Sequence, residues 1–264
     1  MKIGFIGCGN MAKAMIGGVL GKQVVSPEDI MGSTSHQDSL NQVMGEFGIQ
    51  GTLDNGEVAK FADILVLAVK PYLYESVIKS IASAVTENKI VISIAPGKTL
   101  EWLEEQFGKP VKLVRTMPNT PALVGEGMTG VCYNSYLSES ELADTCRIFE
   151  GFGKYELVEE KMMDAVVSVS GSSPAYVFLF IEAMADAAVA DGMPRAKAYK
   201  FAAQAVLGSA KMVLETGKHP GELKDMVCSP GGTTIEAVRV LEACGMRSAV
   251  IEAMKACTEK AKNA

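Results

Sequence analysis

Short apolar runs rich in β-branched residues alternate with amphipathic segments over the first part of the chain, up to about residue 158. The apolar runs predict strands, and the amphipathic segments between them predict helices. We expect strands at residues 2–6, 30–32, 64–69, 90–94, 111–116 and 131–133. Alternation of this kind is typical of βαβ units around a parallel sheet with helices on both faces. The pattern therefore predicts an α/β domain over residues 1–160.

The run ILVLAV at residues 64–69 is apolar throughout instead of alternating. A strand with one face in water alternates apolar and polar residues, so a continuous apolar run needs cover on both faces. We expect this strand at the centre of the sheet.

The strand signals stop after Glu160. Residues 161–264 form long segments rich in Ala and Met, interrupted by Pro174 and by the Gly- and Pro-containing stretches 192–194, 217–221 and 230–232. Because Gly and Pro terminate helices, this pattern predicts an all-helical second domain.

The first long helix of that domain is expected at residues 174–191 and contains neither Lys nor Arg. Ala183, Ala187 and Ala190 recur in it at helical spacing. A helix that is apolar on most sides packs deep in its own domain or against a partner chain. We expect such burial, and with it a homodimer or a larger assembly of dimers.

The composition excludes several classes of partner. A net charge of −6, with no dense run of Lys and Arg, argues against nucleic acid. The longest unbroken apolar stretch, 175–181, is shorter than the ~18 residues of a membrane span, and glycines interrupt the N-terminal run before it resembles a signal peptide. We therefore expect no membrane association.

Cysteine and histidine usage points to the compartment. The six cysteines never form CxxC and do not adjoin the two histidines, so we expect no metal site. Free cysteines of this kind fit a reducing compartment, and we expect a cytoplasmic protein.

The clearest motif is GCGNMA at residues 7–12, which matches GxGxxG/A directly after the first expected strand and before a helical segment that runs to about Gly21. The first glycine permits a tight turn, the second admits a pyrophosphate, and Ala12 keeps the helix close to the strand. The positive end of the helix dipole then faces the anion. We predict a dinucleotide site here.

The end of the second strand, GSTSH at residues 32–36, bears on the choice of nucleotide. Sites for NAD usually carry an Asp or Glu here for the ribose 2′-hydroxyl, and this segment has none. Hydroxyls, backbone amides and His36 can receive a 2′-phosphate instead. NADPH is therefore favoured and NADH stays possible, since no Arg is present either. Lys70 follows the central strand beside Pro71, where parallel sheets bind ligands.

A second candidate site lies at SPGGTT, residues 229–234, just before a helix expected at 235–244. Free N–H groups and the helix dipole at such a start bind a carboxylate, which suits an amino-acid-like substrate. The alternative is structural, with Thr233 or Thr234 serving only as an N-cap. The paired glycines Gly231 and Gly232 exceed what a cap needs and favour substrate binding.

Three motifs together give the chain a family resemblance. RTMPNTP at 115–121, SGSSPAY at 170–176 and PGELKDMVCSPGGTT at 220–234 resemble those of pyrroline-5-carboxylate reductases. The resemblance implies a Rossmann-type doubly wound parallel sheet followed by an all-helical C-terminal dimerisation domain. It also implies reduction of the imine of Δ1-pyrroline-5-carboxylate to L-proline by NAD(P)H, the last step of proline biosynthesis.

The resemblance also implies which residues serve the reaction. Those expected at the cofactor are Ile6, Gly7, Cys8, Gly9, Asn10, Met11, Thr34, His36, Asn55, Ala68, Val69, Lys70, Pro71, Ile94, Ala95 and Pro96, and those expected at the substrate are Gly231, Gly232, Thr233 and Thr234. The chain departs from the family where Ser173 replaces the more usual Gly and Pro96 the more usual Ala. Neither departure removes a chemical group.

Hydride addition to a C=N bond needs a positioned donor, a cationic imine and a proton source, but no metal and no covalent nucleophile. The proton can come with the iminium, from Thr234 or from water. His219 lies near the second site, but Gly217 and Pro220 around it indicate a surface connector.

Two other functions fit parts of the sequence. A β-hydroxyacid dehydrogenase, or another NADP-dependent imine reductase, has similar domains, but β-hydroxyacid dehydrogenases usually carry a catalytic Lys in the helix after the Gly-Ser-rich turn. The segment 175–191 has none. A non-catalytic NADPH-binding sensor is the other alternative, and it leaves residues 229–234 with no role beyond capping.

Overall fold

The computed structural model describes residues 1–262, and its first part is built on one eight-stranded sheet in the order β3-β2-β1-β4-β5-β6-β7-β8. Every neighbouring pair is parallel except β6 and β7. The strands are β1 (Ile3–Ile6), β2 (Ile30–Ser33), β3 (Gln50–Thr52), β4 (Ile64–Leu67), β5 (Ile90–Ser93), β6 (Lys112–Met117), β7 (Gly127–Tyr133) and β8 (Gly153–Leu157).

The expected α/β architecture and its apolar strands are confirmed, but β3 and β8 were missed and β7 is longer than expected. β3 reads Gln-Gly-Thr and β8 reads Gly-Lys-Tyr-Glu-Leu, with no buried residue in either. They lie at the two edges of the sheet, where a strand can be short and polar and leaves no apolar run in the sequence.

The central strand β4 shows why its residues are all apolar. Ile64 and Val66 pack into the core that α1 and α6 cover, whereas Leu65 and Leu67 pack into the opposite core under α3, α4 and α5. All four residues are buried. Successive side chains on a strand point to opposite faces, so β4 belongs to both cores, as expected for a central position.

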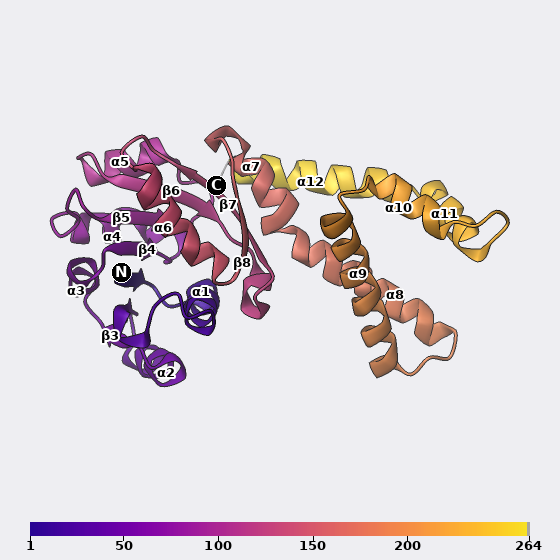
Figure 1. Cartoon of the computed structure of the whole chain (residues 1–264), viewed down its shortest axis with the longest axis horizontal. Helices are drawn as coiled ribbons and strands as arrows, with labels where there is room; N and C mark the ends of the chain where they lie inside the picture. Colours follow the sequence, from indigo (N-terminus) through magenta and orange to yellow (C-terminus); the bar gives the residue numbers. More distant parts are fainter. Residues whose placement is uncertain (263–264) are drawn as a thin grey trace. The chain divides into compact units, whose positions relative to one another are not determined.

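Helices connect these strands (Figure 1). They are α1 (Asn10–Gly21), α2 (Gln37–Phe47), α3 (Asn55–Phe61), α4 (Tyr74–Ile81), α5 (Leu100–Phe107), α6 (Glu139–Glu150) and α7 (Met163–Val166). A turn of π-helix at Val167–Gly171 follows α7.

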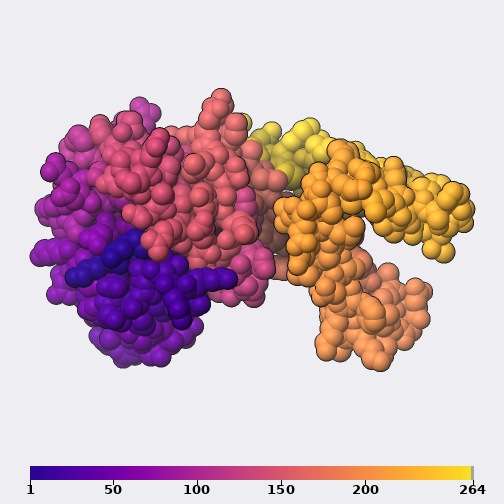
Figure 2. Space-filling view, viewed as in Figure 1, coloured from indigo at the N-terminus to yellow at the C-terminus, as the bar shows by residue number. Residues whose placement is uncertain are grey.

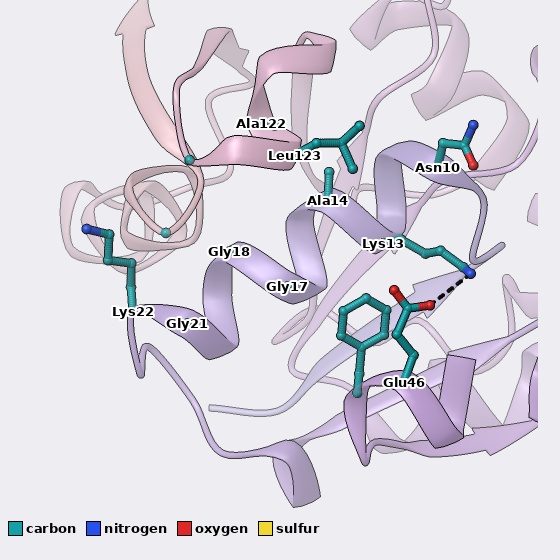
Figure 3. Close-up of a pocket in the computed structure, with 13 residues that line it drawn as sticks. Asn10, Lys13, Ala14, Gly17, Gly18, Gly21, Lys22, Glu46, Ala122 and Leu123 are labelled. Atoms are coloured by element: carbon teal, nitrogen blue, oxygen red, sulfur yellow. Dashed lines mark hydrogen bonds and ion pairs between the residues drawn. The ribbon is translucent and has the colours of Figure 1, made fainter. Parts of the chain in front are cut away.

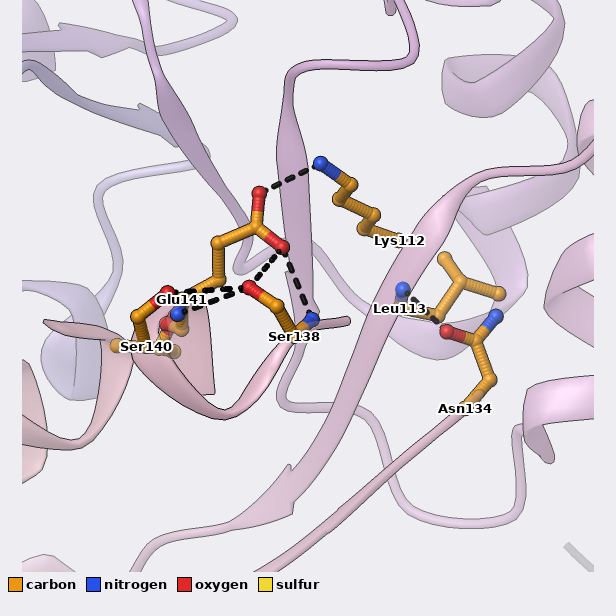
Figure 4. A network of polar contacts seen from close by, with 7 residues as sticks. Lys112, Leu113, Asn134, Ser138, Ser140 and Glu141 are labelled. Carbon is orange, nitrogen blue, oxygen red and sulfur yellow. Dashed lines mark hydrogen bonds and ion pairs between the residues drawn. The ribbon is translucent and has the colours of Figure 1, made fainter. Parts of the chain in front are cut away.

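A polar network fixes α6 beside β6 (Figure 4). Ser138 and Glu141 form a capping box at the start of α6, and Lys112 Nζ lies 2.5 Å from Glu141 Oε1. The lysine and the hydroxyl of Ser138 hold the pKa of Glu141 at about 2. Asn134 accepts from the backbone N–H of Leu113 at 3.1 Å and so joins the end of β7 to β6. Because its pKa is about 2, the Glu141 carboxylate stays ionised at neutral pH and keeps its pairing with Lys112.

The chain divides into two compact units. One comprises Met1–Ser172 together with the segment from Cys257 onward, and the other comprises Ser173–Ala256. The helices beyond residue 172 are α8 (Ser173–Ala190), α9 (Arg195–Thr216), α10 (Pro220–Val227), α11 (Thr233–Ala243) and α12 (Met246–Lys262). Residues 158–262 contain no strand, so the expected helical character of this part is confirmed.

The last turns of α12 return to the first unit. Cys257 Sγ donates to Ser172 Oγ at 3.3 Å, and Thr258 Oγ1 donates to Ser168 Oγ at 2.9 Å. The end of α12 is thereby bonded to the π-helical turn and the residue that follows it.

Helix α8 is largely exposed in the single chain. Only Ala185 is buried among its residues, and the side chains of Phe178 and Leu179 are 61% and 68% exposed. Figure 2 shows an open hollow in this unit, between the α8–α9 hairpin and the end that carries α10 and α11. Of the two expected covers for this helix, its own domain does not provide one, which leaves a partner chain.

Among residues 1–262 one helical run, Glu160–Ala190, is long and apolar enough to cross a membrane by length and composition, with 11% of its most apolar window buried. This run is longer than the unbroken stretch 175–181 because it includes polar residues such as Glu182, and the expected absence of a membrane span stays a prediction. The same apolar surface is what a partner chain would cover.

Candidate dinucleotide and substrate sites

The turn after β1 is built around Gly7. Its φ of +90° lies in the left-handed region, and an added Cβ would come 2.8 Å from Val69 Cγ1 and 2.9 Å from the carbonyl oxygen of Ala68. The Gly7 N–H donates to the carbonyl of Ser33 at 3.1 Å. Only glycine fits this position, and the turn is tied to the carboxyl ends of both β2 and β4.

Gly9 has a different surrounding. It is the N-cap of α1 with a φ of −74°, which any residue adopts, and no described atom lies within 4 Å of an added Cβ beyond its chain neighbours. The glycine is therefore not required by packing. It leaves open the space over the start of the helix, as expected where a ligand approaches the backbone.

The start of α1 offers donors and no competing charge. Within residues 1–262 no side chain caps it, and its first turn contains no acidic residue. The first N–H groups of a helix lack partners within the helix and carry the positive end of its dipole. This end of α1 can therefore hold an anion such as a pyrophosphate.

A cleft of about 970 Å³ opens over this turn at the carboxyl ends of β1, β2, β4 and β5. It brings together most of the residues expected at the cofactor, namely Gly7, Cys8, Gly9, Asn10, Met11, Thr34, Asn55, Ala68, Val69, Lys70, Pro71, Ile94, Ala95 and Pro96. The cleft lies where the chain passes from β2 on one side of β1 to β4 on the other, the usual ligand position in a doubly wound sheet.

Ile6 and His36 were also expected at the cofactor but do not line the cleft. Ile6 is fully buried at the end of β1, in the core with α3 and α4. His36 precedes α2, and its carbonyl accepts from Thr34 Oγ1 at 2.9 Å. This bond fixes the conformation of the Thr34 hydroxyl at the rim of the cleft.

Several lining residues were not among those expected at the cofactor, although Ser33 and Ser35 belong to the hydroxyl-rich segment 32–36 that was expected to receive a 2′-phosphate. Ser33 Oγ donates to Asn55 Oδ1 at 2.7 Å, which joins the end of β2 to the start of α3. The others are Ala14, Ser35, Ser39, Leu53, Leu73, Val77, Thr120 and Leu123. Leu53 carried a signal, since it is an apolar residue in a polar loop, and its side chain is 52% exposed at the cleft.

The electrostatics of the cleft rest on few groups. Lys70 is the only Lys or Arg among the described lining residues. Cys8 lies at the glycine turn, and burial raises the pKa of its thiol to about 11. The thiol is therefore neutral, and it fills the space above Gly32, where an added Cβ would come 2.6 Å from Cys8 Sγ.

A neighbouring cavity of about 670 Å³ runs along the far side of α1 (Figure 3). Lys13 Nζ and Glu46 Oε2 pair at 3.1 Å inside it. Of its glycines, Gly18 is required by packing, because an added Cβ would overlap the backbone of Phe152 and Gly151. Gly18 thus serves helix packing, in contrast to Gly9.

The second candidate site lies at the start of α11. The helix begins at Thr233 instead of residue 235, and its N-cap is Gly232, which has no side chain to cap it. Thr233 and Thr234 are therefore the first two helical residues, and neither occupies the N-cap position considered as the structural alternative. Gly231, with a φ of +68°, makes the turn into the helix. Thr233 is exposed and Thr234 half-buried.

His219 has a structural role in the same unit. Its Nδ1 accepts from the N–H of Gly221 at 3.0 Å, and the residue is the N-cap of α10. This agrees with its interpretation as part of a connector.

The glycine turn, the cleft and the helical second part are those of an NAD(P)H-dependent oxidoreductase with a Rossmann-type domain. A family described as "NADP oxidoreductase coenzyme F420-dependent" matches residues 2–97. A second family, described as "Pyrroline-5-carboxylate reductase dimerisation", matches residues 160–264.

The chain belongs to the pyrroline-5-carboxylate reductase family. It is 57% identical to the pyrroline-5-carboxylate reductase of Escherichia coli, over 99% of this chain and 97% of the relative. It is 43% identical to that of Methanosarcina acetivorans, with the same coverage. A crystal structure of the Plasmodium falciparum pyrroline carboxylate reductase with NADP bound is similar at a TM-score of 0.91 and 34% identity, covering 100% of this chain and 97% of that one.

Gly9→Ala tests whether the open space over α1 receives the dinucleotide. The added methyl meets no protein atom, so we expect only a small fall in melting temperature, because Ala is a poorer N-cap than Gly. It intrudes where a pyrophosphate approaches the backbone, so we expect NADPH affinity to fall on the order of 10- to 100-fold. Fluorescence titration with NADPH and thermal unfolding measure the two effects.

Gly21→Ala is the matched control, because it lies at the other end of α1 and its added Cβ also meets nothing within 4 Å. It should leave NADPH affinity unchanged. Full NADPH affinity in Gly9→Ala would show that the dinucleotide does not occupy this space.

Proposed function

We propose that this protein is an NADPH-dependent pyrroline-5-carboxylate reductase that reduces the C=N bond of Δ1-pyrroline-5-carboxylate to give L-proline. The observation that carries the proposal is the 57% identity to a pyrroline-5-carboxylate reductase over 99% of the chain, which spans both units. The family membership favours this function over a β-hydroxyacid dehydrogenase and over a non-catalytic sensor.

Residues 1–160 are assigned to the NAD(P) cofactor, which supplies the hydride when bound. Gly7 to Met11 and the start of α1 hold the pyrophosphate, and the room left at Gly9 fits such a group. Thr34 follows β2, and Asn55 begins α3 and bonds to Ser33, so both lie on the side assigned to the adenosine ribose. The walls formed by Ala68 to Pro71 and by Ile94 to Pro96 remain for the nicotinamide end.

Residues 161–264 are assigned to substrate binding and dimerisation. The uncapped start of α11, from Gly231 to Thr234, binds the substrate carboxylate through its N–H groups. The hydroxyl of Thr234, which does not serve as the N-cap, hydrogen-bonds to the ring nitrogen and delivers or orders the proton that the imine gains. Oriented binding and this hydrogen bond suffice for the chain's own part in the reaction.

The exposed apolar face of α8 supports a homodimer or an assembly of dimers, in agreement with the dimerisation family that matches residues 160–264. A partner chain on this face would also account for the apolar run Glu160–Ala190 without a membrane. The net charge of −6 gives no support to nucleic-acid binding. We place the enzyme in the cytoplasm.

The purified protein should oxidise NADPH when given pyrroline-5-carboxylate. Its kcat/KM should be higher for NADPH than for NADH. The preference follows from the absence of an acidic residue at 32–36 and from the Thr34 hydroxyl at the cleft.

Thr34→Asp should move the preference toward NADH, because a carboxylate repels the 2′-phosphate. Absorbance at 340 nm follows each reaction. Oxidation of NADPH with a β-hydroxyacid-derived ketone but not with the imine would contradict the function, and a clear wild-type preference for NADH would contradict the phosphate argument.

Thr234→Ala separates a catalytic role from a structural one. If the hydroxyl acts on the imine, kcat/KM should fall on the order of 10- to 1000-fold with NADPH affinity nearly intact. Thr234→Ser keeps the hydroxyl and should retain most activity. Steady-state kinetics and melting temperatures of both variants give the answer, and an unchanged kcat/KM in Thr234→Ala would leave Thr234 without a catalytic role.

Leu179→Asp tests the partner surface on α8. The side chain is 68% exposed in the single chain, so a charge there should break a dimer that buries it. Light scattering should give at least a dimer for the wild type and a smaller species for the variant. Val124→Asp, at a 77% exposed position of the first unit, should leave the assembly intact. A stable, active wild-type monomer is the result that would refute the dimer.

A further inference from the structure

Arg115 has no part in the sites described above, although it opens the motif RTMPNTP that contributes to the family resemblance. It lies on β6 and is 5% exposed. A guanidinium keeps its charge in proteins, so a buried one requires an anionic partner. Its Nη1 donates to Glu160 Oε1 at 2.9 Å.

The same carboxylate oxygen has a second partner. Glu160 Oε1 accepts from the backbone N–H of Leu100 at 2.7 Å. Leu100 is the first residue of α5, and the N-cap Thr99 accepts from Trp102 instead. A carboxylate from far along the chain therefore satisfies a free N–H group at the start of α5, where the helix dipole favours a negative charge.

The segment 94–99 between β5 and α5 depends on this bond. Gly97 has a φ of +74°, so the segment contains a flexible residue. Its amino end is held by Thr116, the residue after Arg115. Thr116 Oγ1 donates to the carbonyl of Ser93 at 3.0 Å. Its carboxyl end is held by Glu160 at Leu100. Two consecutive residues of β6 thus fix both ends, one directly and one through Glu160.

The anchored segment forms a wall of the dinucleotide cleft, since Ile94, Ala95 and Pro96 line it. Ser93 has a second bond, because its Oγ donates to the buried hydroxyl of Tyr74 at 3.3 Å. Within residues 1–262, the side chain that bonds to the N–H of Leu100 is that of Glu160. The N–H of Ile94 also donates to the carbonyl of Leu67 at 3.4 Å, and that of Ala95 to Ser93 Oγ at 3.4 Å. The amino end of the segment is thus held by several bonds, whereas its carboxyl end depends on the Arg115–Glu160 pair.

We propose that Arg115 and Glu160 are positioning residues that hold the segment 94–99 in place for hydride transfer. The proposal rests on the proposed function, in which this wall faces the nicotinamide end. Arg115 holds the carboxylate, and the carboxylate holds α5 and the segment before it. Hydride transfer depends steeply on the placement of donor and acceptor, and a displacement of about 1 Å can lower the rate about 100-fold. Binding of the adenosine and pyrophosphate parts depends on other residues of the cleft.

The test compares Glu160→Ala, Glu160→Gln and the control Glu159→Ala. Glu159 is the preceding acid, and its exposed side chain pairs with Lys161. Glu160→Ala should lower kcat about 10- to 100-fold, with the Kd for NADPH changed only a few-fold. Glu160→Gln keeps an acceptor for Leu100 but not the charge for Arg115. Its kcat should therefore lie between those of the wild type and Glu160→Ala. Glu159→Ala should match the wild type.

Hydrogen–deuterium exchange of the protein without cofactor gives a readout that does not depend on activity. The amide of Leu100 and those of residues 94–99 should exchange faster in both Glu160 variants than in Glu159→Ala, because their anchor is weakened. Should Glu160→Ala not fold, Glu160→Gln carries both measurements. Wild-type kcat together with wild-type exchange in the Glu160 variants would overturn the proposal. A wild-type enzyme inactive on pyrroline-5-carboxylate would overturn the proposed function instead, and exchange would still decide the anchoring.

Discussion

The parallel pairing of β1 with β2 on one side and β4 on the other is the constraint on which the cleft depends. Parallel strands end at the same edge of a sheet, so this pairing gathers the segments after β1, β2, β4 and β5 at one edge. The turn at Gly7 must then fit against the backbone of Ala68 and the carbonyl of Ser33. Because the ends of β1, β2 and β4 lie so close together, only glycine fits at position 7. The turn at Gly7 leads directly into α1, whose first residues line the cleft.

Each unit contains a helix start that the proposed function assigns to an anion, and the two starts have the same backbone arrangement. At α1 and at α11 the N-cap is a glycine without a capping side chain, so the first N–H groups remain available. A side-chain cap would occupy those donors, as Thr99 does at α5. At α5 the carboxylate of Glu160 adds a second, long-range cap.

Much of this could be predicted from local patterns. The run at 64–69 indicated a strand with two covered faces, and β4 contributes to both cores. The glycine motif with its flanking strand and helix indicated a turn whose neighbours do line one cleft. The edge strands β3 and β8 left no apolar run, and Leu53, Leu73 and Val77 reach the cleft only through tertiary packing.

Other features lay outside what a single sequence can specify. The composition of α8 indicated burial, but a pattern of apolar residues does not say whether its cover is the same chain or another one. Helix α11 begins at Thr233, two residues before the predicted start at 235, because Gly232 can act as an N-cap without a side chain. The Arg115–Glu160–Leu100 connection joins residues far apart in the sequence and shows no periodicity that would reveal it.

The return of α12 to the first unit has a consequence for synthesis on the ribosome. The sheet can form once about the first 172 residues have emerged, but Ser168 and Ser172 gain their partners Thr258 and Cys257 only when nearly the whole chain has been made. During the interval the π-helical turn lacks these bonds. The first unit therefore reaches its final state after the second one has been translated, and this order couples the maturation of the cleft-bearing unit to completion of the helical one.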